Sequence, residues 1–460
     1  MLIDEIRISS DIWDRKYRYK KQDGTPVDKT VADSFRRVAE AVAIPEKKAD
    51  RQKWQDEFYQ MMSDYRFLPA GRILAGAGTG RSVTLFNCFV MGQAEDSIAG
   101  IFDELKHAAL AMQQGGGIGQ DFSTIRPAGA PVKSIGAKAS GPVSFMLVWD
   151  AMCRTIMSAG SRRGAMMATL ACDHPDIEIF VEAKHGGKVL QMFNLSVLVS
   201  DAFMAAVKAG DDWDLQFEGR VFKTIKARDL WDSIMRANYD SAEPGVIFID
   251  RVNQLNDLSY CETIHATNPC GEQPLPPFGA CLLGSVNLPR LVRDPFGENG
   301  RLDEDLLVET VSHAVRMLDN VIDVSKFPLP QLAHEAKSKR RIGLGMTGLA
   351  DALAMCGIRY GSDEAVKAAG HWMALIERTA YRTSALLAKE KGTFELYDRE
   401  AYLAAPTIVG LDDETRKLVA EYGVRNALVT SIAPTGTISL FAGNVSSGIE
   451  PIFAYEYSRR

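Results

Sequence analysis

Apolar residues recur at helical spacing in the first part of the chain. Over residues 30–43 they fall on one stripe, and a second stripe of this kind runs over residues 53–65. Residues spaced three and four apart share one face of an α-helix. The pattern therefore predicts two amphipathic helices, and we expect residues 1–82 to form a small helical N-terminal domain.

From about residue 83 the pattern changes to short apolar runs that alternate with helical stripes. Two of the runs, residues 85–91 and 191–200, predict strands. Helices are predicted over residues 100–114, 143–158, 227–239, 303–321 and 363–391. Strands that alternate with helices are typical of an α/β fold. Because no short repeat and no Ser/Pro-rich linker divides this part, we expect one large α/β domain over residues 83–460.

Composition and charge narrow the classes of function. Of the 460 residues, 46% are hydrophobic and 24% are charged, as in ordinary globular proteins, which disfavours disorder and coiled coil. Lys and Arg number 53 against 59 Asp and Glu, so the formal net charge is −6. This balance argues against nucleic acid as a partner, because broad contact with phosphates requires a basic surface. An anionic ligand therefore needs a local site.

The sequence shows no sign of secretion or of a membrane span. Its first residues, Met-Leu-Ile-Asp-Glu-Ile-Arg, carry acids where a secretory signal carries bases. No run reaches the ~18 apolar residues of a spanning helix. The seven cysteines include no Cys-x-x-Cys pair, which disfavours a disulfide scaffold and a zinc ribbon. We expect a cytoplasmic protein without a metal site of its own and without a membrane partner, and we interpret His174 as a residue at the start of a helix.

The stretch Asn-Pro-Cys-Gly-Glu at residues 268–272 combines chemically useful side chains. If it is extended, the side-chain period of two sends Asn268, Cys270 and Glu272 to one face. A thiol can attack or abstract, a carboxylate can take a proton and an amide can orient a substrate. The alternative is a proline–glycine turn around a buried thiol, because single cysteines are usually small core residues.

Two further cysteines add to this picture. Cys281 follows a short way downstream of Cys270, and Cys88 lies far upstream in an apolar run. They fit either two buried strand thiols or a dithiol that supplies two electrons by closing a disulfide. The residues alone leave both alternatives open.

A possible anion site lies at residues 434–439, which are rich in Thr and Gly. We expect the preceding apolar run, residues 427–432, to be a strand that leads into a helix. The N-terminus of a helix has unpaired backbone N–H groups that bind anions. An ordinary Thr-rich helix cap is the alternative.

Two glycine-rich stretches look like nucleotide-binding loops but lack the required context. Residues 115–119 miss the Gly-Lys-Ser/Thr ending of a phosphate-binding loop. Residues 343–348 match Gly-x-Gly-x-x-Gly, but charged residues precede them where a buried strand is required. We interpret the first stretch as a place of close backbone packing and the second as a coincidental match.

Several separated blocks stand out along the chain: residues 87–88, 114–119, 139–144, 162–165, 268–272, 340–345 and 434–439. Taken together and in this order, they resemble the large catalytic subunit of ribonucleotide reductases, most closely its adenosylcobalamin-dependent class. The resemblance runs from about residue 66 to residue 450.

The resemblance implies a ten-stranded α/β barrel of two five-stranded halves, with a finger loop inside it. Cys270 on that loop would become a thiyl radical that removes the 3′ hydrogen of a ribonucleotide. Glu272 would take the 3′-hydroxyl proton, and Asn268 would hold the substrate. Cys88 and Cys281 would reduce the 2′ position and end as a disulfide. The activity implied is the reduction of ribonucleotides to 2′-deoxyribonucleotides for DNA synthesis.

The resemblance also implies two nucleotide sites, for a ribonucleoside di- or triphosphate substrate and a deoxynucleoside triphosphate effector. The substrate phosphates would bind at Thr435, Gly436, Thr437 and Ile438. The effector would bind at the interface of a homodimer, through Asp96, Arg126 and Lys133. A surface ion cluster is the alternative for these three residues. A loop with Arg162 and Arg163 would connect the effector site with the substrate base.

The cofactor implied is adenosylcobalamin, because the Pro-Cys-Gly form of the finger loop and the spacing from Cys270 to Cys281 resemble that class. A thioredoxin-like protein or a dithiol would be the reductant. The chain stops soon after the phosphate block, so we expect the last barrel strand to be missing or supplied by a separate C-terminal chain. The alternatives are a subunit that needs a separate radical-generating partner and a catalytically silent nucleotide-binding scaffold.

Overall fold

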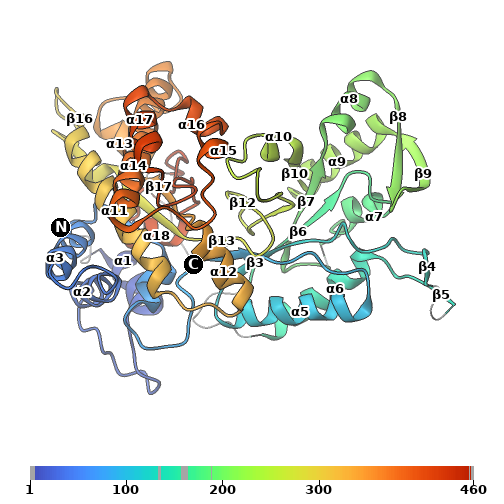
Figure 1. Cartoon of the computed structure of the whole chain (residues 1–460), viewed down its shortest axis with the longest axis horizontal. Helices are drawn as coiled ribbons and strands as arrows, with labels where there is room; N and C mark the ends of the chain where they lie inside the picture. Colours follow the sequence, from blue (N-terminus) through green and yellow to red (C-terminus); the bar gives the residue numbers. More distant parts are fainter. Residues whose placement is uncertain (1–5, 133–135, 157–163, 188, 455, 457–460) are drawn as a thin grey trace. The chain divides into compact units, whose positions relative to one another are not determined.

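The computed structural model describes residues 6–132, 136–156, 164–187, 189–454 and 456 (Figure 1). The chain divides into two compact units. Unit 1 comprises Met1–Asn87, Cys281–Phe327 and Ala333–Arg460, and unit 2 comprises Cys88–Ala280 and Pro328–Leu332. No helix among these described residues has the length and apolar character needed to cross a membrane.

The N-terminal part of unit 1 is helical, as its periodicity predicts. It contains α1 (Arg7–Ile12), a π-helical turn at Trp13–Tyr17, α2 (Val31–Val42), α3 (Arg51–Ser63) and α4 (Gly71–Gly76). Thr30 begins α2 with a capping box, in which the Thr30 hydroxyl accepts from the Asp33 N–H and the Asp33 carboxylate accepts from the Thr30 N–H. The apolar stripe of α2, with Phe35 and Val38, is buried.

A parallel sheet forms the centre of unit 2. Its strands are β2 (Cys88–Val90), β3 (Gly117–Asp121), β6 (Met166–Ala171), β7 (Phe193–Val199) and β10 (Gly245–Phe248). The helices between and after them are α5 (Ile98–Gln113), α6 (Pro142–Thr155), α7 (Ile177–Glu182), α8 (Asp201–Ala209), α9 (Ala227–Ser241) and α10 (Ile249–Gln254). Each strand pairs with the next one of the series along the chain, so right-handed crossovers leave the connecting helices on one face of the sheet.

The face of β3 that meets the segment around residues 267–269 carries Gly117 and Gly119. A Cβ on Gly119 would lie 1.8 Å from the carbonyl oxygen of Thr267, in the short strand β11 (Ala266–Thr267). β11 pairs antiparallel with β12 (Pro274–Leu275), and β11 packs on β3 and β6. Only glycine permits such a close approach of two backbones. The interpretation of residues 115–119 as a place of close backbone packing is confirmed.

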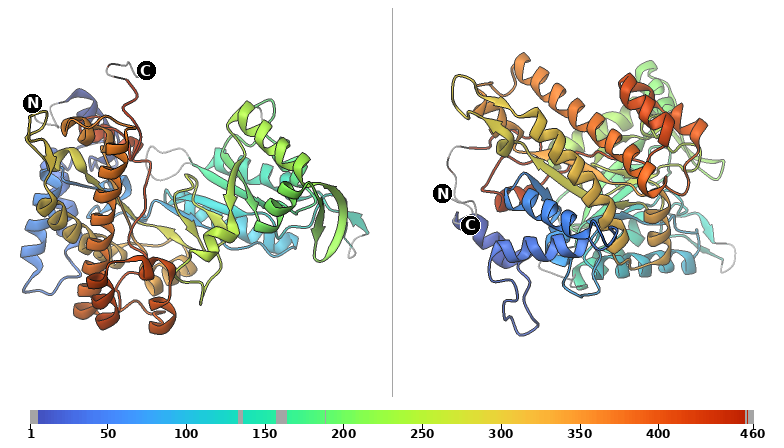
Figure 2. Two further views of the ribbon diagram at one scale, coloured as in Figure 1. Left: turned by 90° about the horizontal axis from the view of Figure 1, so that it is seen from above. Right: turned by 60° about the vertical axis from the view of Figure 1, so that its left-hand side comes forward.

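Unit 1 has a second, smaller sheet, with order β1-β14-β17. The strands are β1 (Phe67–Pro69), β14 (Leu283–Asn287) and β17 (Gly343–Thr347), and β14 and β17 are parallel. The long helices α11 (Glu304–Val324) and α14 (Asp363–Lys391) pack side by side (Figure 2). The glycines of residues 343–348 lie largely within β17 itself rather than in a loop after a strand, so the match to a nucleotide-binding loop is coincidental, as we interpreted it.

The remaining elements are short. The two-stranded ribbons are β4 (Pro131–Val132) with β5 (Ala137–Lys138), β8 (Asp212–Phe217) with β9 (Arg220–Lys226), and β15 (Val292–Arg293) with β16 (Arg301–Leu302). Other short elements are β13 (Ala280–Cys281), a 3-10 helix (Leu288–Leu291), α12 (Pro330–Lys339), α13 (Leu349–Met355), α15 (Arg399–Leu403), α16 (Pro406–Gly410), α17 (Asp413–Tyr422) and α18 (Gly436–Phe441).

One predicted strand is wrong. Residues 427–432 form only a single bridge, between Leu344 of β17 and Thr430. The segment does run along β17, because the Leu344 N–H donates to the Val429 carbonyl and the Ser431 N–H donates to the Leu344 carbonyl. These backbone hydrogen bonds to β17 end at Ser431. An apolar run thus correctly indicated a buried segment, but not a regular strand.

Candidate active site

Residues 268–273, called the finger loop below, connect β11 and β12 in unit 2. The Gly271 N–H donates to the Asn268 carbonyl at 3.0 Å, so residues 268–271 form a β-turn. Proline suits the second position of such a turn, because its φ is already set. Gly271 has φ of +83°, a conformation that favours glycine. Of the two alternatives for this stretch, the extended one is therefore wrong. The turn alternative is correct, except that the Cys270 side chain is exposed rather than buried.

The side chain of Asn268 organises the finger loop. It is fully buried, its Oδ1 accepts from the Gln273 N–H at 3.0 Å, and its Nδ2 donates to Glu272 Oε2 at 2.7 Å. A donor held in this way fixes one carboxylate oxygen of Glu272 in place. The predicted meeting of Asn268 and Glu272 is confirmed, although a turn and a hydrogen bond produce it.

Cys88 lies next to the finger loop within unit 2. It is buried on β2, and a Cβ on Gly117 would lie 3.1 Å from the Cys88 sulfur and 3.0 Å from Cγ of Pro269. The Cys88 sulfur and the Pro269 ring therefore both lie against Gly117 of β3. Cys281 belongs to unit 1, where its side chain is fully buried and its carbonyl accepts from the Asn87 N–H at 2.9 Å.

The predicted phosphate residues lie at the start of α18 in unit 1. Thr435 precedes this helix with φ of +52°, and its hydroxyl oxygen accepts from the Gly448 N–H at 2.7 Å. The same hydroxyl lies 2.9 Å from that of Thr347. The Thr435 side chain thus holds two segments of unit 1 together. The first backbone N–H groups of the helix, from Gly436 onward, have no partner within the helix and can meet an anion.

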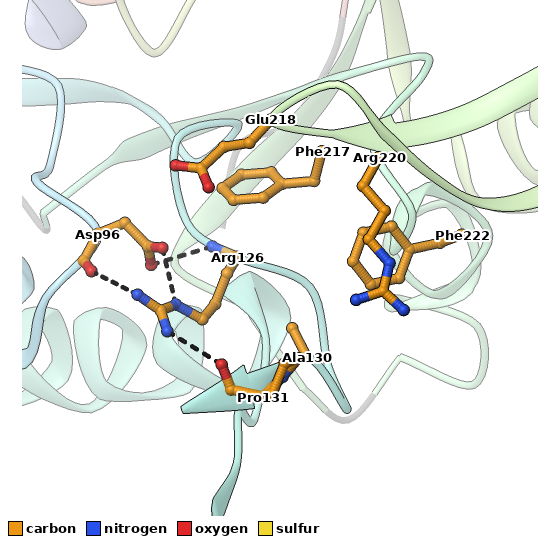
Figure 3. A pocket seen from close by; sticks show the side chains of 8 residues that line it. All are labelled: Asp96, Arg126, Ala130, Pro131, Phe217, Glu218, Arg220 and Phe222. Carbon is orange, nitrogen blue, oxygen red and sulfur yellow. Dashed lines mark hydrogen bonds and ion pairs between the residues drawn. The ribbon is translucent and has the colours of Figure 1, made fainter. Parts of the chain in front are cut away.

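Two of the predicted effector residues, Asp96 and Arg126, meet in a cavity of about 470 Å³ in unit 2 (Figure 3). Arg126 Nε donates to Asp96 Oδ2 at 2.7 Å, and the Arg126 N–H donates to Asp96 Oδ1 at 3.1 Å. The other predicted residues of this region, Lys133, Arg162 and Arg163, lie outside the described residues.

The facing wall of this cavity is the β8–β9 hairpin, which the sequence analysis missed. Its two-residue turn, Glu218 and Gly219, has φ of +49° and +75°, as expected for a tight hairpin. The guanidinium of Arg220 lies 4.9 Å from the centre of the Phe222 ring, close enough for a cation–π contact (Figure 3). The sequence pattern that could have predicted this hairpin is a pair of strand-like segments on either side of Glu218 and Gly219.

His174 connects both walls of the cavity. Its Nε2 lies 2.9 Å from the carbonyl oxygen of Ile125, next to Arg126, and its ring packs edge-on against Phe217 of the hairpin. Its Nδ1 accepts from the Asp176 N–H, just before α7. Burial lowers the pKa of His174, which favours the neutral ring that can accept at Nδ1 while donating at Nε2.

The analysis of the sequence also missed Asn194 on β7. Its side-chain Nδ2 donates to the carbonyl oxygen of Pro269 at 2.7 Å, directly before Cys270. An asparagine in a strand carries no pattern that could indicate a partner 75 residues away. Only the parallel sheet brings it to the finger loop.

Two family descriptions match the chain. Residues 7–82 match "Ribonucleotide reductase, all-alpha domain", and residues 86–460 match "Ribonucleotide reductase, barrel domain". The chain belongs to the ribonucleotide reductase family. This membership confirms the resemblance found in the sequence and the predicted fold class, an α/β barrel type with a helical N-terminal part.

Named relatives refine the comparison. A vitamin B12-dependent ribonucleoside-diphosphate reductase of Mycobacterium tuberculosis (strain CDC 1551 / Oshkosh) is 40% identical over 99% of this chain and 64% of that protein. The enzyme of the same name from Thermoplasma acidophilum is 39% identical over 97% of this chain and 55% of its own length. The ribonucleoside-diphosphate reductase subunit alpha of Chlamydia muridarum is 30% identical over 91% of this chain and 45% of its length. The chain thus spans less than two thirds of these relatives.

Proposed function

We propose that this chain is the catalytic part of an adenosylcobalamin-dependent reductase that converts ribonucleoside diphosphates to 2′-deoxyribonucleoside diphosphates. The observation that carries the proposal is the finger-loop turn. It presents an exposed Cys270 two residues from Glu272, whose carboxylate is held by Asn268 at 2.7 Å. Two of the three relatives are named vitamin B12-dependent ribonucleoside-diphosphate reductases, which supports the choice of substrate and cofactor.

In the proposed reaction Cys270, as a thiyl radical, removes the 3′ hydrogen of the ribose and returns it at the end. Glu272 takes the proton of the 3′-hydroxyl, while the Asn268 amide keeps the carboxylate oriented. The 2′-hydroxyl leaves as water. Cys88 and Cys281 supply two electrons and end as a disulfide, so one dithiol is oxidised for each C–O bond replaced by C–H. A thioredoxin-like protein or a small dithiol then reduces that disulfide.

The residues at the tip of the finger loop fit an external radical source. The Cys270 side chain is exposed, and a Cβ on Gly271 would meet no atom within 4 Å. A bulky group can therefore approach the thiol. When bound, adenosylcobalamin supplies a radical by homolysis of its cobalt–carbon bond, a reaction beyond ordinary acid–base side chains.

The proposal includes two nucleotide sites. Backbone N–H groups at the start of α18, from Gly436 to Ile438, would bind the substrate phosphates, and the Thr435 hydroxyl would keep that helix start in place. A deoxynucleoside triphosphate effector would bind in the cavity of Asp96 and Arg126, with Lys133 on a phosphate. Arg162 and Arg163 would pass the effector signal to the substrate base.

A homodimer is proposed for the working enzyme. Helix α5 begins two residues after Asp96 and exposes three apolar side chains: Ile98, Phe102 and Leu110, with 64%, 47% and 39% of their surface accessible. Exposed apolar side chains on one helix support a protein interface. We further propose a domain boundary near residue 82 and a cytoplasmic location, where thiols stay reduced.

The decisive experiment is turnover of ribonucleoside diphosphate with adenosylcobalamin and a dithiol, with any C-terminal segment of the protein supplied. Cys270→Ala should abolish product while nucleotide binding and thermal unfolding stay as in the wild type. Cys261→Ala, which changes another exposed cysteine, is the matched control and should retain activity.

Other outcomes separate the alternatives. Deoxynucleotide formed by a well-folded Cys270→Ala protein would reject the proposed role of this thiol. Turnover only in the presence of a separate metal-containing radical subunit would assign the chain to the partner-dependent class. Tight nucleotide binding without turnover under either condition would favour a silent scaffold.

A further inference from the structure

The side chain of Asn194 reaches the finger loop from β7. Its Nδ2 donates to the Pro269 carbonyl oxygen at 2.7 Å. That carbonyl belongs to the planar peptide unit between Pro269 and Cys270. The hydrogen bond therefore restrains the orientation of the peptide plane that directly precedes the Cys270 Cα. Within β7, Asn194 is the one exposed position among buried residues.

The backbone on both sides of Asn194 is tethered by one ion pair. Lys184 Nζ lies 2.8 Å from Glu243 Oε2, and the two side chains are mostly buried. Lys184 also donates to the Phe193 carbonyl, and Glu243 accepts from the Leu195 N–H at 3.0 Å. The neighbours of Asn194 are therefore fixed before and after it. The Asn194 backbone is therefore held in one position, and its side-chain amide approaches the Pro269 carbonyl from a fixed direction.

The peptide that Asn194 holds is the central peptide of the β-turn over residues 268–271. Type I and type II turns differ mainly in the orientation of this peptide, and both accept proline at the second position. A type II turn would give Cys270 a positive φ, and Cys270 is not among the residues with positive φ. The hydrogen bond from Asn194 keeps the Pro269 carbonyl in its present orientation and opposes a flip that would redirect the thiol.

The base of the finger loop is held by other contacts. Gly119 allows the Thr267 carbonyl to press against β3, and Asn268 closes the loop onto Gln273. Neither contact acts on the peptide between Pro269 and Cys270. Asn194 therefore restrains the part of the loop that carries the thiol, while the base is restrained independently.

We infer that Asn194 is a positioning residue for Cys270, acting through the Pro269 carbonyl. The inference rests on the proposed function, in which the Cys270 sulfur must meet one hydrogen of the ribose. Misplacement of a reacting group by ~1 Å can cost ~10²-fold in rate. Asn194 touches neither substrate nor cofactor in this role.

The test compares Asn194→Ala with Asn238→Ala in the complete enzyme. Asn238 is a matched control, because its Nδ2 donates to another proline carbonyl, that of Pro244, at 3.0 Å. Asn194→Ala should lower kcat by ~10- to 100-fold and leave KM within about twofold, because orientation is lost and binding is not. Asn238→Ala should leave kcat unchanged, and the two variants should have similar melting temperatures.

The pH dependence of kcat in Asn194→Asp distinguishes a positioning role from a merely structural one. The new carboxylate cannot donate at neutral pH, so kcat should fall at least as far as in Asn194→Ala. As the pH is lowered and the carboxyl becomes protonated, it can donate again, and kcat relative to the wild type should recover. A ratio of kcat values that does not change with pH would overturn the inference.

Alkylation of Cys270 by iodoacetamide tests the inference without turnover. The rate constant for this thiol, followed by mass mapping, should rise several-fold in Asn194→Ala and stay unchanged in Asn238→Ala. Equal rate constants in all three proteins would overturn the inference, whether or not the wild type reduces ribonucleotides. An inactive wild type with a changed alkylation rate would instead reject the proposed function and keep the positioning role.

Discussion

Two buried aspartates, Asp121 in unit 2 and Asp319 in unit 1, have carboxyl groups with different surroundings. In unit 2, Asp121 at the end of β3 accepts from the Ser123 hydroxyl at 2.6 Å and the Thr169 hydroxyl at 3.3 Å. In unit 1, Asp319 on α11 accepts from Arg340 at 2.8 Å and lies 3.5 Å from a nitrogen of Arg425. One carboxyl group has neutral partners, and the other has two cations.

The difference affects the charge of each group. Burial raises the pKa of Asp121, because hydroxyl and amide partners only partly replace water. Burial opposes ionisation of Asp319 as well, but Arg340 and Arg425 outweigh it and hold the pKa of Asp319 below its usual value. The same Thr169 hydroxyl lies 3.2 Å from the His265 carbonyl oxygen, directly before β11. The hydroxyl groups that bond to Asp121, near the base of the finger loop, are thus neutral, whereas the groups that bond to Asp319 are cations.

Glu272→Gln should lower activity strongly and have little effect on stability. The substitution keeps an acceptor for Asn268 but removes the base, and loss of a positioned general base costs ~10²–10⁴-fold in rate. Steady-state turnover and urea unfolding measured on the same preparation test this separation. Turnover equal to that of the wild type would reject the assignment of Glu272.

Arg340→Met should show the reverse behaviour, a large loss of stability. It leaves Asp319 buried without its main cation, and breaking a buried ion pair costs about 3–5 kcal/mol. Arg382→Met is the control, because its partner Asp412 is well exposed and pairs of that kind contribute about 0–1 kcal/mol. Urea unfolding gives both values. Equal losses would show that the cluster around Asp319 is no more important than a surface pair.

A substitution in the pair of Asp96 and Arg126 tests whether this ion pair of unit 2 serves regulation rather than stability. Asp96→Asn removes the charge next to Arg126 and should weaken the coupling between effector and substrate, which is typically about 1–3 kcal/mol. Titration of each nucleotide in the presence of the other measures it, since both affinities must change by the same factor. Unchanged coupling in an active enzyme would leave the two residues as a surface ion cluster.

The pH dependence of stability should have opposite signs at the two buried aspartates. The contribution of Asp319 is fully present above its unfolded pKa, ~3.9, and is lost as the pH falls through its lower folded pKa. At Asp121 the folded pKa is the higher one, so stability falls as the pH rises from ~3.9 through that value. Asp319→Asn should flatten the profile of stability against pH below ~3.9, where the wild type loses stability on acidification. Asp121→Asn should flatten it above ~3.9, where the wild type loses stability as the pH rises. Parallel profiles would contradict the comparison.

Local patterns in the sequence predicted the longer helices well but missed shorter ones such as α8, α12 and α17. Helix α14 begins and ends at the predicted residues, Asp363 and Lys391, and Thr30 caps α2 as a helix-starting threonine should. Periodicity and caps depend on neighbours a few residues apart, so they can be recognised without the fold. The run over 427–432 was predicted less well, because whether an apolar segment joins a sheet depends on the strand beside it.

The chemistry of the finger loop was likewise present in the sequence. Asn268, Cys270 and Glu272 could take part in a reaction only together. Because they lie within five residues of the chain, and because this stretch resembles a known family, the group could be recognised from the sequence. Its shape was not visible. Whether five residues extend or turn depends on the Gly271 backbone and on the Asn268 side chain, which closes the loop onto Gln273.

The sequence by itself determined the longer helices and the family to which the chain belongs, and it indicated which groups are candidates to react. Only the tertiary structure decided that Asn194 holds the peptide before Cys270, that the β8–β9 hairpin faces Asp96, and that two buried aspartates have opposite surroundings. The physical reason is the range of the interactions. Propensity and side-chain period act between near neighbours, whereas hydrogen bonds and charges act between groups that only the folded chain brings together.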